Sequence, residues 1–369
     1  MNLSDVAGID GFNKFNEGDT IRRGLPALAY VNEAFWRLEN EKLFPKAWVF
    51  VGFSHELDKP GDVIPVSVGG KPIFLIRNQA GEIKCFHNVC RHRCLKIIDK
   101  PNNVGPRIRC PYHSWVYNLD GDLQSTPFFG GPNNHTPEEF NMDEQGLVPV
   151  RTGVWHDWIF VNLSGCALEF DEFVAPMERH LKGIDFDLLT PVATLDFGEV
   201  HTNWKALMEN FIEPYHVPFV HASTTEQPLS DHFTVVDGAC LGSAVDVKQS
   251  SDASDTLAVS SRYLTLFPNF VLGRYFPDQI GVHLNISTAT DRTLQRRVIY
   301  TTEGKALSRE QTQALSDLWY KVHKEDHEIC ERLQVGRGSE VAVNGGWLSP
   351  HWENSVRRFQ ELVYESVNN

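Results

Sequence analysis

Residues 88–123 read NVCRHRCLKIIDKPNNVGPRIRCPYHSWVYNLDGDL. They contain two Cys/His pairs, Cys90 with His92 and Cys110 with His113, separated by seventeen residues. Turn-forming and small residues flank each pair, which predicts two facing loop tips. Common zinc spacings pair Cys with Cys and His with His, whereas alternating pairs let one iron of a [2Fe–2S] cluster take both thiolates and the other both imidazoles. The spacing therefore favours such a cluster, with structural zinc as the alternative.

Cys85 and His87 form a second Cys-x-His pattern five residues upstream. They fall in the β-rich run EIKCFHN, where alternate side chains point to one side of a strand, whereas the cluster needs ligands at loop tips. We therefore expect Cys85 to pack as a small buried hydrophobe. A disulfide framework is disfavoured, because the seven cysteines cannot all pair within one chain.

A second group of candidate ligands follows a predicted helix in residues 203–221, NWKALMENFIEPYHVPFVH. On an ideal helix, His216 and His221 would point about 140° apart, so their convergence requires a break. Pro214 and Pro218 supply causes for that break. Two histidines beside an acidic group suit the 2-His-1-carboxylate site of non-haem iron oxygenases. The alternative is that either histidine is a hydrogen-bonded core residue.

The third ligand is sought on a long helix that the sequence predicts from about residue 308 to Gly336 or Gly338. Asp326 falls within about 20° of the direction of Leu315 and Leu333, whereas Glu325 lies about 80° away. A carboxylate within an apolar stripe is costly unless it is paired, and a metal ion is a suitable partner. Asp326 bonded to an arginine or a helix end is the alternative. The expected stripe comprises Leu315, Leu318, Trp319, Val322, Ile329, Cys330 and Leu333.

Composition and element patterns predict an α+β fold in three segments. Helical spacing predicts an N-terminal helical segment over 1–44 that packs on the last segment. Short β-rich runs punctuated by Gly, Pro and Asp predict a small all-β domain over 45–160. Longer helices and strands predict a mixed antiparallel-sheet and helix domain over 161–369.

Charge and hydropathy limit the classes of partner. The chain has 369 residues, and 34 basic against 48 acidic ones give a net charge of −14. No broad basic surface is therefore available for nucleic acid or anionic lipid. No apolar stretch approaches the roughly 18 residues of a membrane helix, and the first residues lack the pattern of a signal peptide. We expect a cytoplasmic protein.

The motifs NVCRHR and CPYHSWVYNLDG resemble the Rieske domain of ring-hydroxylating-type oxygenase α subunits, and the resemblance covers nearly the whole chain. Two departures are visible, because family members often have Gly where this chain has Cys94 and Ser114. The resemblance implies two ligand sets: Cys90, Cys110, His92 and His113 for the [2Fe–2S] cluster, and His216, His221 and Asp326 for a mononuclear iron.

Glu213 is a third departure. Most members have Asp there, where it bridges the mononuclear ligand corresponding to His216 to the Rieske ligand corresponding to His113 of a neighbouring subunit. The resemblance therefore implies a homotrimer with electron transfer between subunits. A Glu at this position resembles the branch acting on carnitine-like and betaine-like quaternary ammonium compounds.

The activity that the resemblance implies is that of a terminal oxygenase component. Such a protein uses O2 and electrons from a separate reductase, with or without a ferredoxin, to hydroxylate, dihydroxylate or oxidatively demethylate a small substrate. The candidates are aliphatic amines, quaternary ammonium compounds and aromatic acids. The chain has no G-x-G-x-x-G fingerprint, so NAD(P)H would act only through the reductase. A non-catalytic Rieske electron carrier or a zinc-binding scaffold is the alternative.

Overall fold

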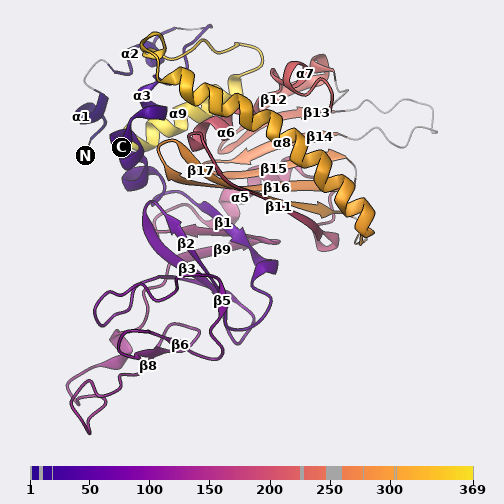
Figure 1. Ribbon diagram of the computed structural model, residues 1–369. Helices are drawn as coiled ribbons and strands as arrows, with labels where there is room; N and C mark the ends of the chain where they lie inside the picture. The colour runs from indigo at the N-terminus through magenta and orange to yellow at the C-terminus, as the bar shows by residue number, and fades with distance from the viewer. Residues whose placement is uncertain are drawn as a thin grey trace. The chain divides into compact units, whose positions relative to one another are not determined.

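The structure is a computed structural model that describes residues 2–368 except 8–10, 19, 225–227, 247–259, 277, 303 and 305. The chain divides into two compact units, one formed by Phe44–Ala167 and the other by Met1–Leu43 together with Leu168–Asn369. Both units contain antiparallel sheets, and nearly all of the long helices belong to the second (Figure 1). The α+β fold class is therefore confirmed.

The unit Phe44–Ala167 is built from three small sheets, with strand orders β1-β10-β9, β4-β3-β2-β5 and β6-β7-β8. Asp120 and Gly121 lie between the paired strands β7 and β8, and β9 pairs with β10. The bounds are β1 Val49–Phe53, η2 Ser54–Glu56, β2 Asp62–Val68, β3 Lys71–Arg77, β4 Ile83–His87, β5 Asn102–Asn103, β6 Ile108–Arg109, β7 Val116–Tyr117, β8 Leu123–Ser125, η3 Met142–Glu144, β9 Arg151–Trp155 and β10 Trp158–Asn162.

The other unit is organised around one seven-stranded sheet with the order β11-β17-β16-β15-β14-β13-β12. Each neighbouring pair is antiparallel. The sequence did not predict β12 and β13. The bounds are β11 Thr190–Val200, β12 His232–Asp237, β13 Cys240–Val245, β14 Ser261–Leu266, β15 Phe270–Phe276, β16 Gln279–Ala289 and β17 Arg292–Thr301.

Helix α8, Arg309–Arg337, runs obliquely across this sheet and contacts β11 and α6 (Figure 1). Its predicted start is confirmed, because Ser308 and Gln311 form a reciprocal capping box. The other helices are α1 Leu3–Ala7, α2 Asn13–Asn16, α3 Leu28–Val31, α4 Glu33–Leu38, η1 Glu39–Leu43, α5 Phe170–His180, η4 Phe186–Leu188, α6 Trp204–Ile212, α7 Val217–Val220, η5 Leu229–Asp231, η6 Glu340–Ala342 and α9 Asn354–Asn368.

The apolar stripe predicted along α8 is partly wrong. Leu318 is 37% exposed and Leu333 is 42% exposed. Trp319 and Cys330 of the predicted stripe are buried, and the third buried side chain of the helix is His323, which was not part of the prediction. Their mean direction lies about 40° from that of Asp326, so the aspartate still belongs to the inward side. The physical reason for the error is that a polar residue, His323, supplies the centre of the packed face.

A buried ion pair ties the N-terminal segment to α6. Lys205 Nζ lies 2.6 Å from Glu39 Oε1, and neither side chain is exposed. Trp204 Nε1 donates a second hydrogen bond to this carboxylate, at 3.2 Å. Burial raises the pKa of Glu39 and lowers that of Lys205, with each charge opposing the shift of the other. Two buried charges thus depend on each other.

We expect Lys205→Met to destabilise the fold by about 3–5 kcal/mol, because it leaves the Glu39 charge buried and unpaired. Adding Glu39→Leu to that variant should recover most of the loss. Urea denaturation of both variants measures the free energy of unfolding. Arg37→Met is the matched control, because Arg37 and Glu33 form an exposed pair (63% and 66%) that should contribute less than about 1 kcal/mol. Equal losses from the buried and exposed substitutions would contradict this interpretation.

None of the helices in the described part of the chain combines the length and the apolar character that a bilayer span requires.

Candidate metal centres

The two Cys/His pairs lie on two loops of the unit Phe44–Ala167. One loop follows β4, and the other connects β6 to β7. The loops share a backbone pattern, because the N–H groups of Cys90 and Cys110 each donate to the carbonyl five residues later, both at 2.8 Å. The N–H groups of Cys94 and Ser114 each donate back to the cysteine carbonyl, at 3.0 and 3.1 Å. Two turns with the same hydrogen-bond pattern therefore hold the two Cys/His pairs.

These turns place two residues in a backbone conformation that favours glycine. Cys94 and Ser114 both have a φ of +57°, in the left-handed region. A side chain costs roughly 1–2 kcal/mol there, and glycine avoids that cost. Both positions therefore have a backbone that glycine, the residue expected there from the resemblance, would adopt more easily.

The four side chains of the two loops lie close together. The His92 and His113 rings are 4.5 Å apart between centroids, and His92 stacks on Trp115 at 4.9 Å. Cys90 and Cys110 are each 1% exposed within the hydrophobic core of this unit. Cys85 lies inside β4, also buried, rather than on a loop tip.

Unsatisfied atoms at this site fit a metal cluster. The buried Nδ1 atoms of His92 and His113 both lack a hydrogen-bond partner among the residues that the structure describes. Burial, together with the charges of His113 and Arg93, lowers the pKa of His92, which favours the neutral imidazole that a metal requires. Two thiols and two imidazoles with free nitrogens match the donor set of a [2Fe–2S] cluster with mixed ligands.

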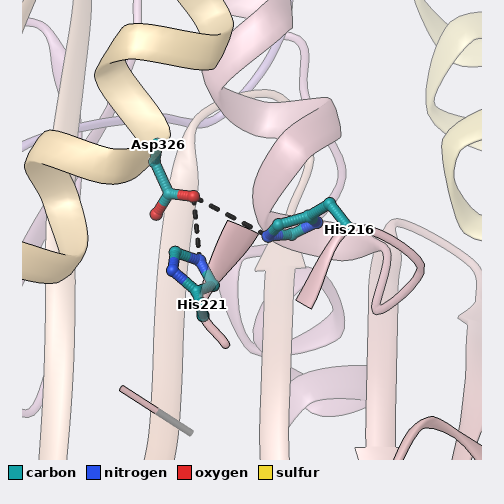
Figure 2. Close-up of side chains that lie close together, drawn as sticks. All are labelled: His216, His221 and Asp326. Carbon is teal, nitrogen blue, oxygen red and sulfur yellow. Dashed lines mark ion pairs between the residues drawn. The ribbon is translucent and has the colours of Figure 1, made fainter. Parts of the chain in front are cut away.

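The second centre is formed where α6 ends. Helix α6 stops at Ile212, just before Pro214, and the short helix α7 begins at Val217. His216 precedes α7 and His221 follows it, so the break expected from the sequence brings their rings to 5.3 Å between centroids. Asp326 reaches the two rings from α8, as Figure 2 shows.

The three side chains point to a common space. Asp326 Oδ1 lies 3.0 Å from Nε2 of His221 and 3.7 Å from Nε2 of His216 (Figure 2). One donor atom from each residue lies within 4.8 Å of the other two, close enough to share an ion. Oδ1 is buried and, within the described part of the chain, makes no hydrogen bond despite these short distances. A cation between the three atoms would satisfy it, so the residues fit a mononuclear metal ion.

Electrostatics also favour a cation at this place. Burial opposes protonation of His221, but the adjoining carboxylates of Asp326 and Glu325 outweigh it and raise its pKa to about 9. Burial likewise opposes protonation of His216, whose pKa is raised because Glu213 and Asp326 outweigh the burial. The carboxylates thus create a negative potential that a divalent ion can neutralise in place of protons.

Glu213 holds the first of these histidines in place. His216 Nδ1 donates to Glu213 Oε1 at 2.6 Å. The other carboxylate oxygen accepts the backbone N–H groups of Tyr215 and His216. Because Nδ1 is committed to Glu213, Nε2 is the nitrogen that faces Asp326.

Glu325 has the corresponding place beside the second histidine, and sequence analysis did not anticipate it. His221 Nδ1 donates to Glu325 Oε2 at 2.9 Å, and the hydroxyl of Thr224 donates to the same oxygen at 3.2 Å. Helical periodicity had predicted that Glu325 points about 80° away from the buried stripe. The missed signal was its adjacency to Asp326, because a metal-binding histidine commonly has a carboxylate partner on its other nitrogen.

We expect Glu325→Ala to weaken iron binding at the His216, His221 and Asp326 centre by about 10- to 100-fold, the usual cost of losing such a partner. Competition with a chelator measures the affinity for Fe(II). Glu328→Ala is the matched control, because Glu328 is exposed on the same helix. The absorption spectrum of the cluster should not change in either variant. Unaltered iron affinity in Glu325→Ala would show that this carboxylate does not support His221.

Comparisons with known protein families find a match within each of the two units. Residues 47–136 match the Rieske [2Fe-2S] domain, and residues 179–368 match the ring hydroxylating alpha subunit (catalytic domain). The chloroplastic choline monooxygenase of Atriplex hortensis is 27% identical over 351 residues, covering 92% of this chain and 77% of that protein. The glycine betaine monooxygenase oxygenase subunit of Chromohalobacter salexigens is 32% identical over 197 residues, covering 53% of this chain and 43% of that protein.

Solved structures share the fold. The quaternary ammonium Rieske monooxygenase CntA in complex with L-carnitine superposes with a TM-score of 0.79 at 22% identity, covering 94% of this chain and 96% of that one. Naphthalene 1,2-dioxygenase with indole bound gives 0.75 at 19% identity, covering 96% and 95%. The family match spans more than half of the sequence and agrees with the donor sets above. The chain therefore belongs to the ring-hydroxylating oxygenase alpha subunits, enzymes that carry a Rieske [2Fe–2S] domain ahead of a non-haem iron catalytic domain.

Proposed function

We propose that this chain is the terminal oxygenase for a small quaternary ammonium compound or aromatic acid. The observation that carries the proposal is the convergence of His216, His221 and Asp326, with one unsatisfied carboxylate oxygen between the two imidazoles. When bound, the cluster supplies single electrons and the mononuclear iron supplies the place where dioxygen is reduced. A separate reductase, with or without a ferredoxin, provides those electrons.

The protein's own residues would bind the two metal groups and orient the ligands that hold them. Glu213 and Glu325 fix the Nδ1 protons of the two histidines, so that both Nε2 atoms stay unprotonated towards the ion. The four cluster ligands would be Cys90, Cys110, His92 and His113. Residues 45–160 would form the Rieske domain and 161–369 the catalytic domain, with 1–44 packed on the latter. The grouping of Met1–Leu43 with Leu168–Asn369 supports this division.

The substrate class is suggested by the relatives. Choline, glycine betaine and L-carnitine, which are named with three of them, are quaternary ammonium compounds. Salicylate, named with a 30% identical hydroxylase of Ralstonia sp that aligns over 53% of this chain, is an aromatic acid. Glu213 supports the quaternary ammonium branch. Hydroxylation, dihydroxylation and demethylation are the candidate outcomes.

We also propose a homotrimer in which the cluster loops of one subunit face the Glu213 region of the next. Exposed aromatic side chains beside both regions support this arrangement. Tyr112 is 52% exposed next to His113, and Phe128 is 63% exposed in the same unit. Tyr215 and Phe219, which follow Glu213, are 45% and 75% exposed. Burial of these rings between subunits would remove apolar surface from water. The cytoplasmic location stays a prediction.

Metal analysis and a substrate screen test the proposal. The purified protein should hold about three irons per chain and show a Rieske signal by EPR when reduced. With a surrogate reductase and O2, glycine betaine, L-carnitine, choline and salicylate should be screened for oxidised product. Two irons without a product would identify an electron carrier, and zinc without colour a scaffold. Either result would refute the oxygenase assignment.

A further inference from the structure

A buried arginine that forms no ion pair with the described residues lies on the seven-stranded sheet. Arg297 on β17 is 1% exposed. Its guanidinium carbon lies 3.6 Å from the ring centre of Trp319 and 4.9 Å from that of Tyr275. No ion pair joins it to a carboxylate in the described part of the chain. A buried charge without a partner is costly, which suggests that a ligand completes the site.

One edge of this guanidinium is unsatisfied. Nη1 lies 3.2 Å from His323 Nε2, whereas Nε and Nη2 are buried and lack a hydrogen-bond partner of good geometry among the described residues. The Tyr275 hydroxyl and the Asp326 carboxylate act on the guanidinium electrostatically and oppose the lowering of its pKa by burial. Nε and Nη2 form the edge that presents parallel N–H groups, the arrangement that binds both oxygens of a carboxylate. Gly281 on β16 lies beside the edge, where a β carbon would come within 2.3 Å of Nη2. Glycine is therefore required for the guanidinium to lie there.

A second polar side chain with a nitrogen that lacks a hydrogen-bond partner among the described residues, His283, lies opposite Arg297 on the neighbouring strand β16. His283 is the register partner of Arg297, so both side chains project from the same face of the sheet. His283 is 5% exposed, and its Nε2 is buried with no hydrogen-bond partner in the described ranges. Its ring lies 4.7 Å from that of His323 between centroids. Burial first, and then the Arg297 charge, lower the pKa of His283 well below the usual range.

The pair borders the mononuclear centre. His323, which contacts Arg297, precedes Asp326 on α8 by one helical turn. Residues three apart on a helix are neighbours, at about 5–6 Å between β carbons. A small molecule held at Arg297 would therefore extend towards the ion bound by Asp326.

We propose that Arg297, assisted by His283, binds the carboxylate of the substrate, so that the enzyme acts on small carboxylic acids rather than on their neutral or alcohol counterparts. This inference rests on the proposed function and narrows its substrate class. Glycine betaine and salicylate both carry the required group. Choline, which has an alcohol in place of the carboxylate of glycine betaine, does not.

Anaerobic calorimetric titration of the iron-loaded protein tests the inference without turnover. The probes are two matched pairs, glycine betaine with choline and salicylate with salicylamide. One of the two acids should bind at least about 10-fold more tightly than the compound of its pair that lacks the carboxylate. The reason is that a hydrogen bond to a charged group contributes about 1.5–3 kcal/mol. Which acid binds distinguishes an aliphatic from an aromatic substrate.

Arg297→Met should abolish this preference, and Arg297→Lys should retain part of it, because an ammonium keeps the charge but lacks the planar fork. Arg292→Met, at the start of the same strand, pairs with Asp291 near the surface and should bind all four probes like the native protein. The acid should also raise the melting temperature of the native protein but not that of Arg297→Met. A purely structural arginine would not produce this ligand-dependent difference.

Three results would overturn the inference: equal binding within both probe pairs, an acid preference that survives in Arg297→Met, or no binding of either acid at about 10 mM, above the usual range of Michaelis constants. If Arg297→Met fails to fold, the partial preference of Arg297→Lys decides. Each of these failures leaves iron content and oxygenation intact. Failure of the proposed function would instead appear as missing iron or missing product, with the acid preference preserved.

Discussion

Replacing Asp326 with alanine is expected to abolish oxygenation and to reduce the iron content from about three to about two per chain. The carboxylate is the only acidic donor among the three converging residues, and its Oδ1 lies within 3.7 Å of both imidazoles. Its loss leaves two neutral donors for a divalent ion. The effect should exceed the roughly 10- to 100-fold cost of losing an outer carboxylate such as Glu325.

Iron analysis, the Rieske EPR signal and product formation should be measured together. The EPR signal should remain, because Asp326 belongs to a different unit from the cluster ligands. Glu328→Ala on the exposed side of α8 serves as the control and should keep both iron content and activity. An Asp326→Ala protein that retains its third iron and its turnover would remove this residue from the metal centre.

Glu213→Ala should have the second largest effect, through coupling rather than through metal loss. We expect this variant to bind iron more weakly, as Glu325→Ala does, but to keep both metals at saturating Fe(II) and yet to lose substrate oxidation. His216 is held by Glu213 through one hydrogen bond of 2.6 Å, but its Nε2 would still be available to the ion. In the proposed trimer, this carboxylate would also contact the His113 loop of the neighbouring subunit. Its removal would interrupt the path between the two centres.

A single-turnover experiment separates the two contributions of Glu213. The variant is reduced chemically and mixed with O2 and substrate, and reoxidation of the cluster is followed by absorbance together with product. Glu213→Gln is the matched variant, because it keeps the size and one acceptor oxygen but removes the charge. Normal coupled turnover in Glu213→Ala would defeat the bridging role, and loss of iron in that variant would assign Glu213 to metal support instead.

The motifs could be predicted from the sequence because their chemistry is local. Cys90, His92, Cys110 and His113 stand on short loops whose spacing alone restricts the cluster type. The helix break before His216 could also be predicted, since Pro214 disfavours helical geometry in the residue before it.

Features that depend on tertiary packing could not be predicted. The apolar face of α8 was predicted only in part, because the buried His323 takes a place in the packed face while Leu318 and Leu333 are exposed. Strand β13 was missed because the short run CLGSAV contains little of the β-branched pattern that marks a strand. Strand β12, HFTVVD, does carry that pattern and was overlooked. The site at Arg297 could not be predicted from the sequence for a related reason. An arginine in a strand usually faces solvent, and only the register with His283 shows that this one is buried.

The central claim is that reduced Rieske protein alone can complete one oxidation at the centre of His216, His221 and Asp326. The direct test is to reduce the trimer or monomer as isolated, remove the reductant, and add 18O2 with the best-bound acid from the titration. The account predicts reoxidation of the cluster and a product that contains 18O or has lost a methyl group as formaldehyde. Reoxidation without any product, at full iron content, would contradict it.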